Sequence, residues 1–200
     1  MAERLTGEER RRVIVEASVA LFSQKGFRGT TTKEIAEAAG CSEATIFKHF
    51  ATKHELYSAI LETKSRIEET LAKAAQAAAG KDDAGVLRAV GFESLIRTEQ
   101  DPSLMRLLLF SALEGHDLSH LFFESKVRRL HEFLSGYIQE RIADGAFQAV
   151  DPLLAARGFV GMVAHYLLIH EIFGVKRPAG VLPEHVIETF VGLFLQGIRR

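Results

Sequence analysis

Cysteine is nearly absent from this 200-residue sequence, and long apolar runs are missing altogether. The single cysteine, Cys41, excludes an internal disulfide and a zinc site with several cysteine ligands; its place in a tight turn indicates a small buried side chain rather than a nucleophile. No stretch approaches the roughly 18 to 20 uninterrupted apolar residues that span a bilayer. The N-terminus is charged and has no signal-type segment, so the sequence predicts a cytoplasmic protein with no membrane partner.

Net charge is also small, at -1 for the whole chain. This value argues against a protein that coats nucleic acid over its whole surface, but it hides a local difference. Residues 1–53 contain nine lysines and arginines and seven aspartates and glutamates, a net charge of +2, and the remainder carries -3. The asymmetry allows a nucleic-acid face at the N-terminal end without establishing one.

Catalytic and metal-binding signatures are missing as well. The sequence has no Ser-His-Asp arrangement typical of a catalytic triad, no glycine-rich phosphate-binding loop, and no pair of catalytic carboxylates with a supporting motif. Two clusters, EGHDLSH and HYLLIHE, raise the alternative of a metal site or a hydrolase. His165 and His170 lie about 140° apart around a helix, unlike a zinc pair at i and i+4, and the other cluster lies at an expected helix break. We therefore predict no enzyme, no cofactor and no metal.

What the sequence does contain is helical periodicity, with 47% apolar and 26% charged residues. Its helix start signals are three Thr-Glu capping boxes and one serine N-cap: Thr6 with Glu9, Thr31 with Glu34, Thr52 with Glu55, and Ser42. Gly26 and Gly40 are expected to end the first two helices, and the helix after Thr52 is expected to run from Lys53 to about Ala79. Later helices are expected near 84–99, 102–114, 118–143, 152–173 and 184–199. The fold class is therefore all-α, with about nine helices.

Three short helices in the first 50 residues, the last two joined by AGCSE, are typical of a helix-turn-helix, although a purely structural three-helix bundle has the same pattern. In CSEATIFKHF, the periodicity places Ile46 and Phe50 together on the inner side of the third helix. The opposite side carries small or polar residues: Ala44, Thr45, Lys48 and His49. This side is expected to enter a groove of DNA, and the Arg10–Arg12 triplet is expected to stay in solvent or to meet an anion.

The run from Gly26 to Leu56, GFRGTTTKEIAEAAGCSEATIFKHFATKHEL, resembles the DNA-binding segment of the TetR/AcrR family of bacterial transcription regulators. The resemblance implies an N-terminal three-helix helix-turn-helix DNA-binding domain over 1–52 and a C-terminal helical effector-binding and dimerisation domain over 53–200. It implies a DNA face formed by Thr32, Lys33, Ala44, Thr45, Phe47, Lys48, His49 and Lys53, and Glu43 shares this face.

Two residues of this face depart from the family pattern. Phe47 stands where tyrosine is usual, so a phenolic hydrogen bond to phosphate is lost. Glu43 stands where lysine or arginine is common, and it repels a nearby phosphate unless it turns to a cytosine amino group or to a neighbouring lysine. These two positions are where operator preference is least predictable.

Phenylalanine and leucine recur at helical spacing in the C-terminal two-thirds, and most of them are expected to form the core. The resemblance implies an effector pocket among the middle helices, for which we expect these lining residues: Phe92, Ile96, Arg97, Leu108, Phe123, His131, Phe133, Tyr137, Met162 and Tyr166. It also implies a homodimer formed through the helices near 152–173 and 184–199.

The function expected from this resemblance is a transcriptional repressor that a small apolar or amphipathic ligand releases from its double-stranded DNA operator. The helix from Lys53 to about Ala79 is the expected lever between the two parts. Two alternatives stay open: a small-molecule-binding or enzymatic protein that keeps the N-terminal bundle, and a constitutive DNA-binding protein without an effector.

Overall fold

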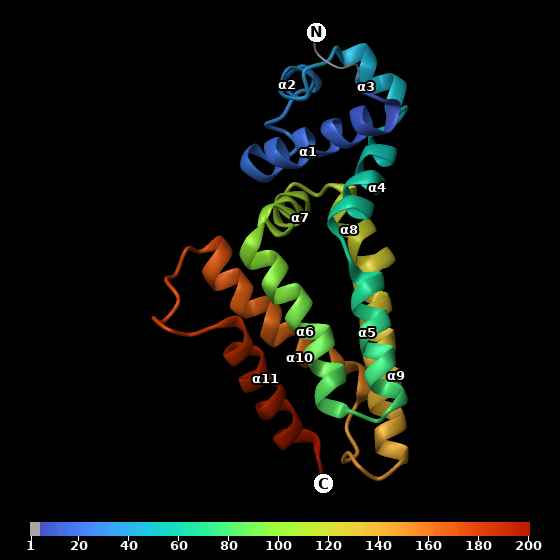
Figure 1. Cartoon of the computed structure of the whole chain (residues 1–200), viewed down its shortest axis with the longest axis vertical. Helices are drawn as coiled ribbons and strands as arrows, with labels where there is room; N and C mark the ends of the chain where they lie inside the picture. Colours follow the sequence, from blue (N-terminus) through green and yellow to red (C-terminus); the bar gives the residue numbers. More distant parts are fainter. Residues whose placement is uncertain (1–4) are drawn as a thin grey trace. The chain divides into compact units, whose positions relative to one another are not determined.

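The computed structural model describes residues 5–200, apart from the side chain of Lys53. Within this range the chain is helical (Figure 1), and its β structure is one isolated bridge between Phe147 and Arg199. The predicted all-α class is confirmed. The chain forms two compact units: unit 1 combines the residues up to Arg66 with Ser103–Phe123, and unit 2 combines Ile67–Pro102 with Glu124–Arg200.

Unit 1 is larger than the 1–52 segment to which the sequence assigns DNA binding. It contains the three N-terminal helices and three further ones: α1 (Gly7–Lys25), α2 (Thr32–Ala38), α3 (Glu43–His49), α4 (Lys53–Lys64), α7 (Ser103–Leu113) and α8 (Asp117–Phe122). Helix α7 packs on α1, and α8 packs on α4. The functional boundary after residue 52 stays a prediction, because compactness alone does not assign function.

The helix starts in unit 1 follow the local sequence. Complete capping boxes join Thr6 with Glu9 and Thr31 with Glu34. The Ser42 side chain accepts a hydrogen bond from the Thr45 amide, as an N-cap should. Gly26 ends α1 with a positive φ of 72°, a backbone conformation that glycine adopts most readily.

The predicted third capping box is only half formed. The Thr52 side chain accepts a hydrogen bond from the Glu55 amide, as predicted. The Glu55 carboxylate does not return to the Thr52 amide but accepts from the amide of Ala51, at 2.9 Å. The N-cap itself is therefore correct, and the reciprocal bond moves by one residue.

The predicted single helix from Lys53 to about Ala79 is wrong, because it is two helices. Helix α4 ends at Ser65, whose φ of -89° and ψ of 131° are extended, and α5 (Ile67–Ala79) begins two residues later. Lys64 in the last turn of α4 and two glutamates in the first turn of α5 favour a helix end followed by a helix start, because each charge complements the adjacent helix dipole. The break coincides with the boundary between the two units.

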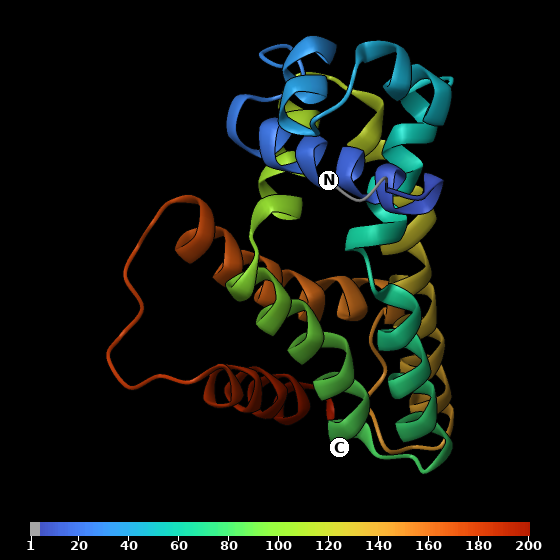
Figure 2. The same ribbon diagram turned by 45° about the horizontal axis from the view of Figure 1, so that its top comes forward.

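Unit 2 contains five α-helices: α5, α6 (Asp83–Gln100), α9 (Arg128–Ala143), α10 (Pro152–Leu167) and α11 (Pro183–Ile198). Helix α6 packs against α5, α10 and α11, and α9 packs against α5 and α10. Figures 1 and 2 show α5 beside α9, and α6 beside both α5 and α11. The expected helix over 118–143 contains a π-helical segment, Phe123–Val127, between α8 and α9. A second π-helical segment, Leu168–Ile172, extends α10.

The helix over Pro152–Ile172 is long and apolar enough, by length and composition alone, to cross a membrane. Core helices of water-soluble proteins meet the same criterion, and here α10 packs against α6, α9 and α11. Its starting residues follow the prediction: the Asp151 side chain accepts from the Leu154 amide at 2.8 Å, and Pro152 occupies the first turn.

Candidate nucleic-acid interface

Helix α3 is anchored by two apolar side chains and leaves its other side open. Ile46 is 4% exposed and Phe50 is 2% exposed, as their spacing predicted. Glu43, Ala44 and Lys48 are exposed, and the Phe47 ring is 60% exposed. An exposed aromatic ring beside an exposed lysine offers both an apolar and a cationic contact, so this side of α3 is a candidate contact surface.

The start of α2 lies next to this surface. Thr32, the first residue of α2, is half-buried, and the exposed Lys33 forms a long ion pair with Glu37, at 4.0 Å. The capping carboxylate of Glu34 accepts hydrogen bonds from the amide and hydroxyl of Thr31 and also meets Lys25 Nζ at 2.7 Å. The bond from Lys25, followed by those from Thr31, lowers the pKa of Glu34 from 4.5 to about 2. These bonds fix the start of α2, and the Lys33 side chain is exposed to solvent.

The Arg10–Arg12 triplet is not simply a solvated face, which corrects the prediction. Arg10 donates to the backbone carbonyl oxygens of Ala39 (3.1 Å) and Gly40 (3.2 Å), at the end of α2. Arg11 donates to the carbonyl oxygen of His49 at the end of α3, and its guanidinium lies 4.2 Å from the centre of the Phe50 ring. Cations at helix C-termini satisfy free carbonyl groups and complement the helix dipole.

Glu114, at the end of α7, fixes the loop between α1 and α2. One of its carboxylate oxygens accepts hydrogen bonds from the amides of Phe27 (3.0 Å) and Arg28 (3.2 Å), and Arg28 donates back to the Glu114 carbonyl oxygen. This role could not be predicted from the sequence, because the partners are more than 80 residues apart and no local pattern joins them.

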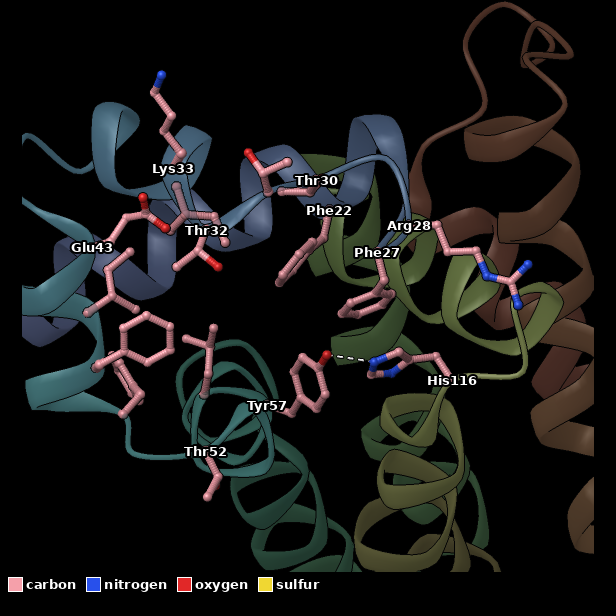
Figure 3. A pocket seen from close by; sticks show the side chains of 16 residues that line it. Phe22, Phe27, Arg28, Thr30, Thr32, Lys33, Glu43, Thr52, Tyr57 and His116 are labelled. Atoms are coloured by element: carbon pink, nitrogen blue, oxygen red, sulfur yellow. Dashed lines mark hydrogen bonds between the residues drawn. The ribbon is translucent and has the colours of Figure 1, made fainter.

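A pocket of about 530 Å³ opens between α2, α3 and α4 within unit 1 (Figure 3). Four residues of the predicted DNA face lie along it: Thr32, Lys33, Glu43 and Phe47. Figure 3 shows Tyr57 and His116 facing each other, with a hydrogen bond of 2.6 Å between Tyr57 Oη and His116 Nε2. The structure thus brings residues of α2 and α3 together around one opening.

The other residues of the predicted face are placed as follows. Ala44 and Lys48 are exposed on α3, and the half-buried Thr45 has its hydroxyl 2.9 Å from that of Ser42. His49 is half-buried at the end of α3. The side chain of Lys53 lies outside the described part of the structure.

The ten residues expected to line an effector pocket are divided between the units. Leu108 and Phe123 belong to unit 1, where Leu108 packs against the apolar core. The other eight lie in unit 2 on three helices: Phe92, Ile96 and Arg97 on α6, His131, Phe133 and Tyr137 on α9, and Met162 and Tyr166 on α10.

Several of these eight residues have structural partners. Arg97 pairs with Glu69 at 3.0 Å and with Glu93 at 3.3 Å, and the Tyr137 hydroxyl donates to the buried Asp83 carboxylate at 2.7 Å. His131 is buried, and this burial lowers its pKa. The Tyr166 ring meets the ring of His170, with 4.4 Å between their centres.

Metal ligands do not cluster in the residues that the structure describes, where no three His, Cys, Asp or Glu side chains are placed to hold an ion. Cys41 is half-buried and packs against the core of unit 1. The arrangement offers an exposed helix face beside a capped helix start, with one exposed lysine on each helix, Lys33 on α2 and Lys48 on α3, and this is suited to contacting a polyanion.

Comparisons with known proteins agree with this arrangement. Residues 14–60 match the family described as bacterial regulatory proteins, tetR family, and residues 85–197 match the C-terminal domain of AefR-like transcriptional repressors. The HTH-type transcriptional regulator YvkB of Bacillus subtilis is 28% identical over 185 residues, 92% of this chain and 95% of YvkB. The regulator AcrR of Shigella flexneri is 28% identical over 184 residues, 86% of this chain and 85% of AcrR.

The fold also matches solved structures. AibR, in complex with isovaleryl coenzyme A and operator DNA, superposes with a TM-score of 0.64 at 23% identity, over 92% of this chain and 97% of AibR. The second family match alone covers more than half of the sequence. The chain therefore belongs to the TetR family of helix-turn-helix transcriptional regulators.

Proposed function

We propose that this regulator is a cytoplasmic repressor, which binds operator DNA through α2 and α3 and leaves it when a small apolar or amphipathic ligand binds in unit 2. The observation that carries the DNA-binding part is the asymmetry of α3. Ile46 and Phe50 hold the helix by one side, while Ala44, Phe47 and Lys48 are exposed on the other.

Helix α3 has the dimensions for reading a major groove. Its seven residues give a length of roughly 10 Å, which fits within a groove about 12 Å wide. Thr45 supplies a hydroxyl for a base edge, Ala44 permits close approach to a thymine methyl, and Lys48 supplies a cation for a base or a phosphate. Lys33 lies at the start of α2, where a helix N-terminus also favours phosphate.

Ligand control is supported by the relatives. The structure of AibR contains isovaleryl coenzyme A together with operator DNA, so one protein of this fold binds both classes of partner. The C-terminal match to AefR-like repressors supports repression as the sign of regulation. In this scheme the ligand and the DNA are linked by a coupling free energy, because each favours a different separation of two recognition helices that must lie about 34–36 Å apart on DNA.

A homodimer is supported by apolar side chains that α10 and α11 leave exposed. Leu154 on α10 is 64% exposed and Leu193 on α11 is 58% exposed. The apolar sides of two such helices can pair with the same sides of a second copy, as in isologous interfaces. Leu154→Arg with Leu193→Arg is expected to give a mass near the single-chain value of 22.2 kDa in light scattering, while the parent gives twice that value. Equal masses for the two proteins would contradict the assigned interface.

DNA binding is tested by fluorescence anisotropy with the promoter DNA next to the gene, over a range of salt concentrations. Lys48→Ala is expected to weaken binding. It should also reduce the slope of the logarithm of the binding constant against the logarithm of the salt concentration, by about 0.9 for each lysine removed. Thr45→Ala is expected to weaken specific binding by about tenfold. Lys176→Ala, in an exposed loop of unit 2, is the matched control. If Thr45→Ala and Lys48→Ala both bind specific DNA as the parent does, the assigned face is wrong.

A further inference from the structure

The pocket in unit 1 has the size and lining of a small-molecule site. Its volume of about 530 Å³ falls within the roughly 300–1,000 Å³ typical of ligand pockets. Its apolar walls come from four helices and the loops between them, with Phe22, Ile35, Ile46, Phe50 and Leu56 among the lining residues. Eight of the ten residues expected to line the effector site lie in unit 2, and none of the ten lines this pocket, so the pocket is a separate feature.

One wall of the pocket is a cluster of aromatic rings. The centres of the Phe22 and Phe27 rings lie 4.4 Å apart, and Tyr57 meets Phe27 edge to face at 5.2 Å. The His116 ring is stacked on Phe27 at 4.0 Å, with 9° between the planes. Aromatic walls favour flat aromatic ligands, because ring pairs gain energy beyond the burial of apolar area.

The hydrogen bonds of His116 determine which atom at this wall can still donate. The Leu118 amide donates to His116 Nδ1 at 3.3 Å, so Nδ1 carries a lone pair and the proton of the neutral ring is on Nε2. Nε2 therefore donates to Tyr57 Oη across the 2.6 Å contact. Tyr57 then keeps its own hydroxyl proton for an acceptor, although its side chain is only 4% exposed.

The charged groups near Tyr57 determine which charge a ligand in this pocket can carry. Burial, together with the carboxylates of Asp117 and Glu114, raises the pKa of the Tyr57 hydroxyl, which stays a neutral donor. The same negative field disfavours an anion beside Tyr57, and the apolar walls disfavour any ion that leaves water. An acceptor without charge, such as a carbonyl oxygen, meets both conditions.

We propose that this pocket binds a small, uncharged aromatic molecule with a carbonyl-type acceptor, whose ring packs on Phe22, Phe27 and Tyr57 while its acceptor accepts a hydrogen bond from the Tyr57 hydroxyl. Whether the pocket binds this ligand does not depend on whether the chain binds DNA. The consequence of this binding for regulation rests on the proposed function: Lys33, Glu43 and Phe47 belong both to the pocket and to the proposed DNA face, so the ligand and the DNA compete.

The test uses benzophenone, an uncharged diaryl ketone that inserts into nearby C–H bonds under near-ultraviolet light. The full chain is illuminated with benzophenone, and adducts are located by peptide mass spectrometry. Adducts are expected on residues that line the pocket. Their yield is expected to fall about fivefold in Tyr57→Phe, which loses one hydrogen bond but keeps the ring.

Ser94→Ala is the control, since it removes a hydroxyl from unit 2 at a residue outside both sites and should leave the pocket adducts unchanged. Thermal unfolding by circular dichroism establishes that both variants are folded. Adducts confined to residues 67–102 and 124–200, or pocket adducts with the same yield in Tyr57→Phe, would overturn the site.

Competition with DNA is measured separately. Benzophenone is expected to raise the apparent Kd for promoter DNA in the parent and to raise it less in Tyr57→Phe. An unchanged Kd in the parent would refute the competition. If the parent does not bind the DNA, the proposed function fails, while the adduct map still decides whether the pocket is a ligand site.

Discussion

Arg11 binds the C-terminal end of α3 through the backbone of His49, with 2.8 Å between Arg11 Nη1 and the His49 carbonyl oxygen. The same guanidinium lies over the Phe50 ring. The first helix of unit 1 therefore contributes to the position of α3 by binding its C-terminal end.

Replacement of this arginine tests its role. Arg11→Met keeps an apolar stem but loses the hydrogen bond and the cation–π contact, so we expect the free energy of unfolding to fall by about 1 kcal/mol. Urea unfolding followed by circular dichroism measures the change. Arg12→Met, at the exposed neighbour in the same triplet, should have little effect. Equal stability of Arg11→Met and the parent would show that the contact contributes nothing.

Glycine is required at position 26 for two reasons: its backbone conformation and the lack of room for a side chain. Its φ of 72° and ψ of 179° lie in a region that is nearly exclusive to glycine, and a Cβ here would collide with the Glu114 carboxylate. We expect Gly26→Ala to destabilise the protein by about 2 kcal/mol or more. Gly40→Ala is the matched control, because its φ of 60° is also positive but nothing lies within 4 Å of the added Cβ. Equal losses in the two variants would show that the contact with Glu114 is unimportant.

The lowered pKa of Glu34 is expected to make the stability of unit 1 fall at acidic pH. Because its pKa in the folded protein, about 2, is below the ordinary value of 4.5, the ionised form stabilises the fold. This contribution is complete above pH 4.5 and is lost as the pH falls toward about 2. The difference in melting temperature between the parent and Glu34→Gln should therefore shrink as the pH falls through this range. A difference that does not vary with pH would rule out the linkage.

Asp83 joins three parts of unit 2. Its carboxylate accepts from Tyr137 (2.7 Å), Arg141 (2.8 Å) and Arg199 (3.3 Å). Burial raises the pKa of Asp83, but the bonds from Arg141 and Tyr137 outweigh this effect and lower it overall. We expect Asp83→Ala to lower the free energy of unfolding by about 3 kcal/mol, because a buried tyrosine and an arginine lose their acceptor.

The adjacent Asp82 provides the control for this change. Its side chain caps α6 by accepting from the Gly85 amide at 2.9 Å. Asparagine is an equally good N-cap, so Asp82→Asn should be nearly neutral in the same urea titration. If the two variants lose a similar free energy of unfolding, the hydrogen bonds of Asp83 do not contribute the stability proposed for them.

The elements that the sequence predicted best depend on interactions over a few residues. The capping boxes at Thr6 and Thr31, the N-cap at Ser42 and the stop at Gly26 lie where expected, because a cap joins side chain and backbone three residues apart. The burial of Ile46 and Phe50 follows from helical periodicity in the same way.

Only the tertiary structure decided which distant residues meet. Arg11 lies 38 residues from His49, Tyr57 lies 59 from His116, and Phe27 lies 87 from Glu114. The break at Ser65 was also missed, because an alanine-rich segment continues the helical pattern beyond it. Local sequence determined where helices start and which sides they bury, whereas the pocket and the anchoring of α3 depend on helix packing, which brings together side chains that no local pattern connects.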